Sequence, residues 1–163
     1  MKRRQFFAVA ALAGMAAALP LSSALADDTA QSVVEEYLAA WNAHDSARAA
    51  AFLADDVVYY DASVGKPIEG REAAKAGVID NFLNAVPDAA WTMRGAPVIQ
   101  GDRVSFEWEF AGTNTGAWAD GTAATNKKFK LEGASMFTVK DGKITVQNDY
   151  YDALSFYKQL GLM

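Results

Sequence analysis

The sequence contains no cysteine and only one histidine, His44. Without cysteine the chain can form no disulfide, offers no thiol nucleophile and has no cysteine-based metal site. A single histidine also excludes any metal or catalytic site that needs two of them. Stability must therefore come from the hydrophobic core. Site chemistry must come from carboxylates, hydroxyls, amides and aromatic rings, and we expect no metal.

Basic residues are few relative to acidic ones. The chain has 15 Lys and Arg against 20 Asp and Glu, which gives a formal net charge of −5 at pH 7. Apart from the first residues, no stretch gathers the basic side chains into a cluster. Nucleic acids and anionic membrane surfaces are bound through such clusters. The sequence therefore argues against both kinds of partner.

Residues 1–26 have the three parts of a secretory signal peptide in the right order. A basic start (K-R-R, residues 2–4) is followed by an alanine-rich apolar run, and A-L-A at residues 24–26 fits a cleavage site. A membrane anchor needs about 20 strongly apolar residues to span the bilayer. The apolar run here is shorter than that and rich in alanine. We expect cleavage after Ala26, a periplasmic or secreted protein, and no membrane association after cleavage. The R-R-x-F start also resembles the twin-arginine export signal.

Residues 27–163 then form the mature protein, 137 of the 163 residues. That length suits one compact domain and is too short for two. The net charge of the mature chain becomes −8, since the removed segment holds three basic residues and no acidic one.

The first half of this domain has mostly helical periodicity. Apolar side chains recur at i, i+3, i+4 and i+7 from Val34 to Trp41, which predicts a helix over residues 29–43. We predict further helices over residues 46–53 and 71–85.

The rest of the domain is rich in β-branched and aromatic residues with strand alternation. The expected strands are residues 57–61, 91–99, 103–111, 127–139 and 143–151. Short turns at residues 100–102 and 141–142 make hairpins of neighbouring strands, and residues 112–125 form a longer loop. These elements predict an α+β fold: a curved antiparallel (mixed) sheet wrapped as a cone around three N-terminal helices, with a short C-terminal helix.

The C-terminal stretch, residues 140–163, is the most function-like part of the chain. Strict alternation places Ile144, Asn148 and Tyr150 on one face of the last strand and Asp149 on the other. Asp152 follows the strand, where it could serve as a catalytic carboxylate among aromatic residues or simply cap the last helix.

Motifs along the chain carry a resemblance to known proteins. W-N-A-H-D (41–45), D-D-V-V-Y-Y-D (55–61) and G-R-E-A (70–73), in this order of elements, resemble the nuclear-transport-factor-2-like superfamily. Three further motifs are G-T-N-T-G (112–116), A-T-N-K-K (124–128) and D-G-K-I (141–144), the last running on to Asp152 and Q-L-G (159–161). They are similar to the SnoaL-like polyketide cyclase (ester cyclase) branch of that superfamily. The resemblance covers essentially the whole mature domain.

In cyclases of that branch an aspartate before the terminal helix acts as general acid and base, without metal or cofactor. The resemblance therefore implies Asp152 as the catalytic residue, with Asp149 as the alternative. Asn114 stands where the family often has a histidine, and Ser135 lies near the expected position of a second one.

Aromatic and polar side chains of the predicted strands, first helix and long loop are the candidate substrate-pocket residues: Trp41, Tyr59, Tyr60, Trp108, Asn114, Trp118, Ser135, Asn148 and Tyr150. For Tyr59 and Tyr60, packing in the core is the competing interpretation. Trp118, in the long loop, is a candidate lid or ligand contact.

These observations predict an exported, cofactor-free enzyme acting on a small, apolar carbonyl compound. Asp152 would move a proton α to the carbonyl group, while Tyr60, Asn148 or Tyr150 would orient the oxygen. The alternative is a non-catalytic module of the same fold that binds a small ligand or serves dimerisation. The resemblance also implies a homodimer formed through the sheet.

Overall fold

A computed structural model describes residues 21–163, with side chains from Ala30 onward. Residues 1–20, the greater part of the predicted signal peptide, lie outside the described residues, so that interpretation stays a prediction. Among the described helices, none combines the length and apolar character needed to cross a membrane.

The helices follow the predicted apolar periodicity. Helix α1 (Leu21–Asn42) begins earlier than expected, and α2 (Ser46–Ala51) follows after a short turn. Asp45 caps α2, because its carboxylate accepts a hydrogen bond from the Arg48 backbone N–H at 2.9 Å. The predicted helix over residues 71–85 is continuous but has a π-helical centre. Its three segments are α3 (Arg71–Ala74), η1 (Lys75–Asp80) and α4 (Asn81–Ala85).

Six strands form one mixed sheet in the order β2-β1-β6-β5-β4-β3. Their bounds are β1 (Leu53–Asp61), β2 (Pro67–Glu69), β3 (Ala90–Gln100), β4 (Arg103–Thr113), β5 (Lys128–Lys140) and β6 (Lys143–Tyr151). Only the β1–β6 pair is parallel. Strand β2 is not among the strands predicted from the sequence. Helix α5 (Ala153–Leu160) follows β6 and ends at Gly161, whose φ of 71° places it in the left-handed region.

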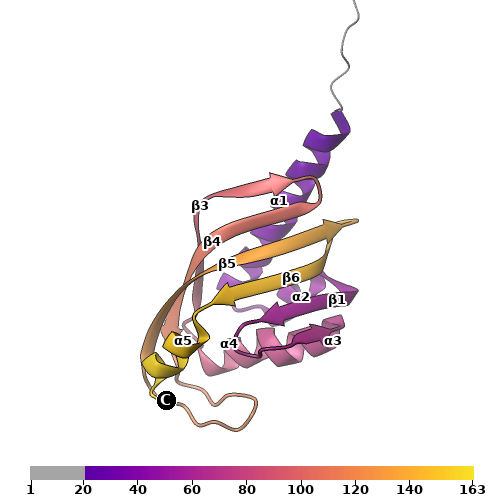
Figure 1. The fold of residues 1–163 in the computed structure, drawn as a ribbon. Coiled ribbons are helices and arrows are strands. Elements are labelled where there is room, and N and C mark those ends of the chain that lie inside the picture. Colours follow the sequence, from indigo (N-terminus) through magenta and orange to yellow (C-terminus); the bar gives the residue numbers. More distant parts are fainter. Residues whose placement is uncertain (1–20) are drawn as a thin grey trace, which may run out of the picture.

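The sheet is strongly curved and wraps around the helices, which lie on its concave side (Figure 1). Strand β4 shows why the core lies there: Val104, Phe106, Trp108 and Phe110 alternate along the strand and are all buried. The predicted α+β cone is therefore confirmed.

A β-bulge in β6 decides which residues face the interior. The hairpin turn forms as predicted, with positive φ at both Asp141 and Gly142. Val139 then pairs with Ile144, but Thr138 pairs with Val146, so Thr145 is an extra residue. One inserted residue shifts the inward-facing positions of a strand by one. The expectation that Asn148 and Tyr150 would share the inner face with Ile144 is therefore wrong.

Candidate active site

A small cavity of about 30 Å³ lies between the helices and the concave face of the sheet. It is mostly aromatic, with two carboxylates. Its lining residues are Trp41, Tyr59, Asp61, Val78, Phe82, Trp91, Trp108, Phe110, Leu131, Asp149 and Tyr151. Among the described residues that line it, none is Lys, Arg or His.

Asp149 is buried in this cavity and is held by three side-chain donors. Ser135 Oγ donates to Asp149 Oδ1 at 2.5 Å, while Tyr59 Oη and Gln147 Nε2 donate to Oδ2 at 2.8 Å and 2.9 Å. Ser135 is itself fixed, because Trp108 Nε1 donates to its hydroxyl at 2.7 Å. The carboxyl group of Asp149 is therefore rigidly oriented.

The pKa of Asp149 is raised from 3.8 to about 7. Burial is the largest cause, since it disfavours the charged form, and the negative charge of Asp61 adds to it. The hydrogen bonds from Ser135, Tyr59 and Gln147 act in the opposite direction but do not outweigh burial. A carboxyl group with this pKa can give and take protons near neutral pH.

Asp61 is the register partner of Asp149 on the neighbouring parallel strand, at the end of β1. It is buried, and its Oδ1 accepts hydrogen bonds from Ser63 N at 2.8 Å, Ser63 Oγ at 2.6 Å and Tyr151 Oη at 2.9 Å. Burial raises its pKa, although these hydrogen bonds partly oppose the shift. Two buried carboxyl groups from neighbouring strands thus line the same cavity.

Several buried donors near the cavity have no partner among the described residues. They include Nε1 of Trp41 and of Trp91, two rings that line the cavity, and the hydroxyl of Tyr37. Buried polar groups are nearly always hydrogen-bonded, so unpaired donors beside a cavity suggest that a ligand or water normally supplies an acceptor.

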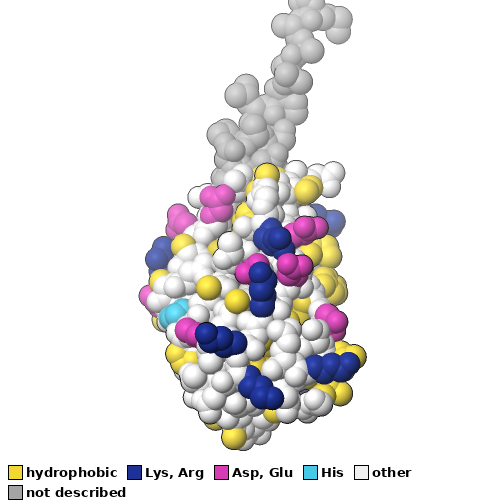
Figure 2. Space-filling view, turned by 90° about the vertical axis from the view of Figure 1, so that its left-hand side faces the viewer, with side chains coloured by type: hydrophobic (Ala, Val, Ile, Leu, Met, Phe, Trp, Pro, Cys, Tyr) yellow, Lys and Arg dark blue, Asp and Glu magenta, His cyan; other side chains and the backbone are white. Residues whose placement is uncertain are grey.

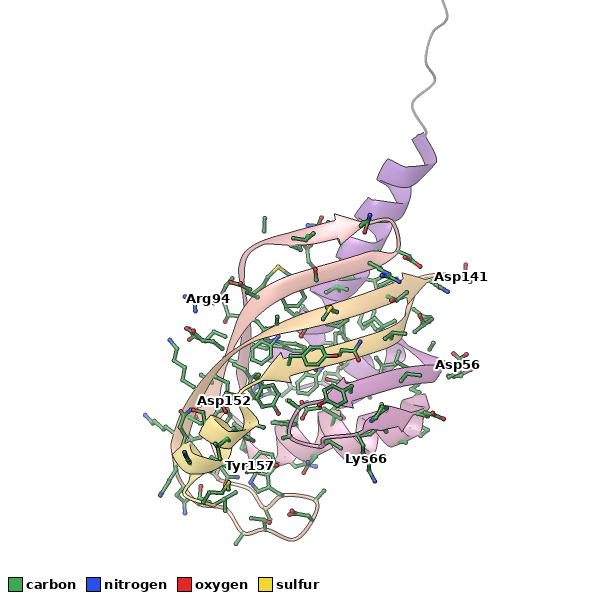
Figure 3. All side chains as sticks on the ribbon, in the orientation of Figure 1. Asp56, Lys66, Arg94, Asp141, Asp152 and Tyr157 are labelled. Atoms are coloured by element: carbon green, nitrogen blue, oxygen red, sulfur yellow. The ribbon has the colours of Figure 1, made fainter. Side chains whose placement is uncertain are left out.

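Asp152 does not reach the cavity. It is exposed at the start of α5, and its Oδ1 accepts a hydrogen bond from Ser155 N at 2.9 Å (Figure 3). This is the geometry of a helix N-cap. Of the two predicted catalytic aspartates, the geometry therefore favours Asp149.

The predicted pocket residues divide between the two faces of the sheet. Trp41, Tyr59 and Trp108 line the cavity, and Ser135 contacts it through Asp149. The other three strand residues lie on the outer face: Tyr60 and Tyr150 pack ring to ring at 5.4 Å, and Asn148 lines an outer groove with Met136 and Val98.

Asn114 and Trp118 belong to the loop between β4 and β5. Asn114 is buried and holds the loop together: its Nδ2 donates to Ala85 O at 3.0 Å, and its Oδ1 accepts from Thr125 N at 2.9 Å. Trp118 packs on Phe82 and Phe156, with ring centroids 5.4 Å and 5.8 Å away. Trp118 and Phe156 also line a groove of about 590 Å³ beside α5.

The sequence-based reasoning missed Asp61, Gln147 and Tyr151. Asp61 alternates with Val57 and Tyr59 on β1, so the apolar-aromatic pattern of that strand already placed it on an inward face. No pattern in the sequence indicated that Gln147 and Tyr151 face the cavity. Strict alternation places them opposite Ile144, and the bulge at Thr145 turns them inward.

The surface agrees with the charge pattern of the sequence. On the face shown in Figure 2, Lys and Arg side chains are interspersed with Asp and Glu. Within the described part of the chain, no three His, Cys, Asp or Glu side chains are grouped in a way that could bind a metal.

Comparison with known proteins supports the fold. The SnoaL-like domain family matches residues 34–147. A candidate polyketide cyclase from Xanthomonas campestris pv. campestris has 27% identity and a TM-score of 0.67, over 82% of this chain and 98% of that one. A candidate SnoaL-like polyketide cyclase from Jannaschia sp. CCS1 has 13% identity and a TM-score of 0.72, over 85% and 95% of the two chains.

A third structure of the same fold comes from Catenulispora acidiphila DSM 44928. It is a protein with a ketosteroid isomerase-like fold in complex with trimethylamine, and it has 24% identity and a TM-score of 0.66, over 79% of this chain and 92% of that one. Among curated proteins, none matches the sequence.

Proposed function

The chain belongs to the SnoaL-like domain family, and from this premise we propose that it is an acid–base enzyme that needs no cofactor. Its substrate is a small, largely apolar carbonyl compound, and its reaction is a proton transfer of the cyclase or isomerase type. Asp149, rather than Asp152, is the group that moves the proton.

The observation that carries this proposal is the buried carboxyl group of Asp149, with its pKa raised to about 7. A general base is most effective when its pKa lies close to the working pH. Apolar surroundings combined with a few fixed donors are the usual means of tuning a carboxyl group in this way.

The unpaired donors support a substrate that carries an oxygen. The indole N–H groups of Trp41 and Trp91 lack acceptors among the described residues, and both rings line the cavity. A carbonyl oxygen placed there would accept hydrogen bonds that strengthen as negative charge develops on it during enolisation.

The size of the cavity limits what enters it. A volume of about 30 Å³ holds about one water molecule, so only the reacting end of a substrate fits without movement of side chains. The groove of about 590 Å³ beside α5 is the place for the remainder. Phe82 connects the two spaces, since it lines the cavity and packs on Trp118 and Phe156 of the groove.

Exchange of α-protons for deuterium, followed by NMR on a panel of small apolar ketones and diketones, tests the proposal without knowledge of the product. We expect the wild-type protein to catalyse exchange on some members of the panel. Asp149→Asn should lower that rate by about 10²–10⁴-fold, the usual contribution of a general base.

The matched control is Asp152→Asn, which changes an exposed aspartate between β6 and α5, outside the cavity. It should leave the exchange rate within about twofold of the wild-type rate. Exchange that is undiminished in Asp149→Asn would contradict the proposal. Equal losses in the two variants would mean that the effect comes from damage to the C-terminal region rather than from chemistry.

A second candidate function is non-catalytic binding of a small apolar ligand. The observation that favours it is the contrast in size, because the groove is far larger than the cavity that holds the carboxylates. A ligand that co-purifies unchanged with the protein, together with no exchange on the whole panel, would support binding over catalysis.

Export is part of the proposal, since the signal-peptide pattern of residues 1–26 predicts cleavage after Ala26. Expression of the full chain in a bacterial host and mass spectrometry of the periplasmic fraction should find a protein that begins at Asp27. Recovery of the uncleaved chain in the cytoplasm would contradict it.

A further inference from the structure

We propose that Phe82 and Trp118 form a wall that decides which substrates reach Asp149. The wall admits carbonyl compounds with a slender reacting end, such as a methyl ketone, whose body carries no negative charge and stays in the groove beside α5. A compound that is branched on both sides of its carbonyl group is kept out of the cavity. This inference rests on the proposed function, because it names the substrate class and the specificity-determining residues of that same site.

The cavity and the groove adjoin at α4, yet no described residue lines both. Consecutive residues of that helix face different spaces, since Asn81 lines the groove and Phe82 lines the cavity. The Phe82 ring is buried, stacks on Phe156 at 6.0 Å and meets Trp118 edge-on at 5.4 Å. Phe156 and Trp118 line the groove. At α4, a layer of aromatic rings therefore separates the groove from the cavity.

The loop between β4 and β5 is fastened to α4 on both sides of Phe82. On one side, Ala119 N donates a hydrogen bond to Asn81 Oδ1 at 2.7 Å. On the other, Gly116 N donates to Ala85 O at 3.0 Å. The tryptophan of the loop lies between these two attachments in the sequence, so its ring is held against the helix.

The motif G-T-N-T-G (112–116) builds this attachment. Asn114 Nδ2 donates to Ala85 O at 3.0 Å, the same carbonyl oxygen that Gly116 N contacts. A Cβ atom on Gly116 would collide with Asn84 O of α4, so the backbone can approach the helix this closely only with glycine. The motif thus supports the wall, although neither Asn114 nor Gly116 lines the cavity.

The wall limits access because the cavity behind it is small. A volume of about 30 Å³ holds about one water molecule, whereas the groove has about 590 Å³. On its other side the Phe82 ring meets Phe110 edge-on at 5.8 Å, so it has packing partners in both directions. Displacing a ring from such close packing costs stability. A slender carbonyl end therefore enters more readily than a branched one.

The groove determines what the body of the substrate can be. Its lining combines aromatic rings such as Phe156 with neutral polar side chains such as Asn81 and Thr122. Asp120 is the one charged residue among the described residues that line it, so a negatively charged body is repelled. The indole N–H of Trp118 is buried without an acceptor in the described part of the chain, and an oxygen of the body would supply one.

Titration with two isomeric ketones, followed through the indole N–H resonances, tests the wall without catalysis. The probes are methyl pentyl ketone, which has a slender end, and diisopropyl ketone, which is branched on both sides. In the wild-type protein both should shift the resonance of Trp118 in the groove, but only methyl pentyl ketone should shift those of Trp41 and Trp91 in the cavity. Cavity tryptophans that respond to both isomers, or to neither, would overturn the wall.

Two variants of Phe82 extend the test. Phe82→Leu keeps most of the apolar volume, and Phe82→Ala removes the ring entirely. In both, diisopropyl ketone should now shift the resonances of Trp41 and Trp91. The matched control is Phe129→Ala, because the Phe129 ring is also buried and packs on Phe156 at 5.0 Å but lines neither space. It should leave the cavity tryptophans unresponsive to diisopropyl ketone. The same unresponsiveness in a folded Phe82→Leu would contradict the proposal.

The exchange assay separates this inference from the proposed function. Phe82→Ala should raise the ratio of kcat/KM for diisopropyl ketone to that for methyl pentyl ketone by about tenfold or more, and Phe129→Ala should leave it within about twofold. If the ratio does not change while Asp149→Asn abolishes exchange, the proposed function stands and the wall is wrong. If neither ketone exchanges but the titration separates the isomers as expected, the wall stands and the proposed function is wrong.

Discussion

At the scale of single residues, the main feature is a buried carboxyl group with no cation beside it. Asp149 gains three hydrogen bonds, yet its pKa is raised to about 7, so its environment stabilises the protonated form. Catalytic groups are commonly tuned in this way at a cost in stability. The pH dependence of unfolding should therefore reveal Asp149 without any knowledge of the substrate.

We predict that Asp149 makes the folded state less stable as pH rises. The pKa of Asp149 is raised from 3.8 in the unfolded chain to about 7 in the folded protein. Between these values the folded state binds the proton and the unfolded state does not, so this contribution to the free energy of unfolding is fully present below pH 3.8 and is lost as pH passes 7. The slope for one proton is about −1.4 kcal/mol per pH unit.

Urea unfolding between pH 4.5 and 8 measures this contribution. The difference in the free energy of unfolding between wild type and Asp149→Asn should change by up to about 1.4 kcal/mol per pH unit as pH rises to about 7 and level off above that value. Asp152→Asn serves as the control and should run parallel to the wild type. A difference between wild type and Asp149→Asn that is constant with pH would show that Asp149 has an ordinary pKa.

At the scale of helices and strands, periodicity predicted nearly every element. The spacing from Val34 to Trp41 defined the buried face of α1, and the alternation from Val104 to Phe110 defined that of β4. Both patterns are local consequences of backbone geometry, so they are readable without the fold.

The candidate site was harder to predict, because one residue, Thr145, decides it. Strict alternation placed Asn148 inside and Asp149 outside, whereas the bulge reverses the two. A bulge depends on how two strands pair, which a single strand's pattern does not contain. The prediction for Asp152 failed for a different reason. Aspartate is typical both of catalytic sites and of helix N-caps, and the local sequence is the same in the two cases.

Close packing between neighbouring strands fixes the donor network, and Gly133 is the position that permits it. On β5, Gly133 pairs with Trp108 of β4 and with Tyr151 of β6. A Cβ atom there would lie 2.5 Å from Trp108 Cη2 and 2.5 Å from Tyr150 O, too close for any real contact. We predict that Gly133→Ala lowers the free energy of unfolding by about 1–3 kcal/mol and displaces Trp108.

Denaturant unfolding measures that loss, and the indole N–H resonance of Trp108, which reports its hydrogen bond to Ser135, measures the displacement. The control is Gly77→Ala in η1, where a Cβ would meet only the end of the flexible Ile68 side chain at 3.0 Å. Alanine also favours a helix over glycine, so we expect little loss there. An equal effect of the two substitutions would contradict the packing argument.

At the scale of the whole molecule, the two faces of the sheet differ in what covers them. The concave face is covered by helices and encloses the cavity (Figure 1). The outer face carries a groove of about 470 Å³ and large apolar side chains in the open, namely Val98 (70% exposed), Met136 (48%) and Tyr150 (45%). Apolar patches of this kind on a soluble domain are typical of interaction surfaces.

We predict that the occupant of this outer face is a second copy of the chain, as the family resemblance implies. A self-complementary contact buries the same patch on both copies, so one substitution changes the interface twice. Met136→Lys should therefore shift a dimer to a monomer at micromolar concentration, because two lysines would be buried without partners. Size-exclusion chromatography with light scattering measures the mass.

Leu154→Lys, an equally exposed apolar position on α5, is the control and should remain dimeric. A wild-type chain that is monomeric at every concentration, or a Met136→Lys variant that stays dimeric, would place the interface elsewhere or remove it.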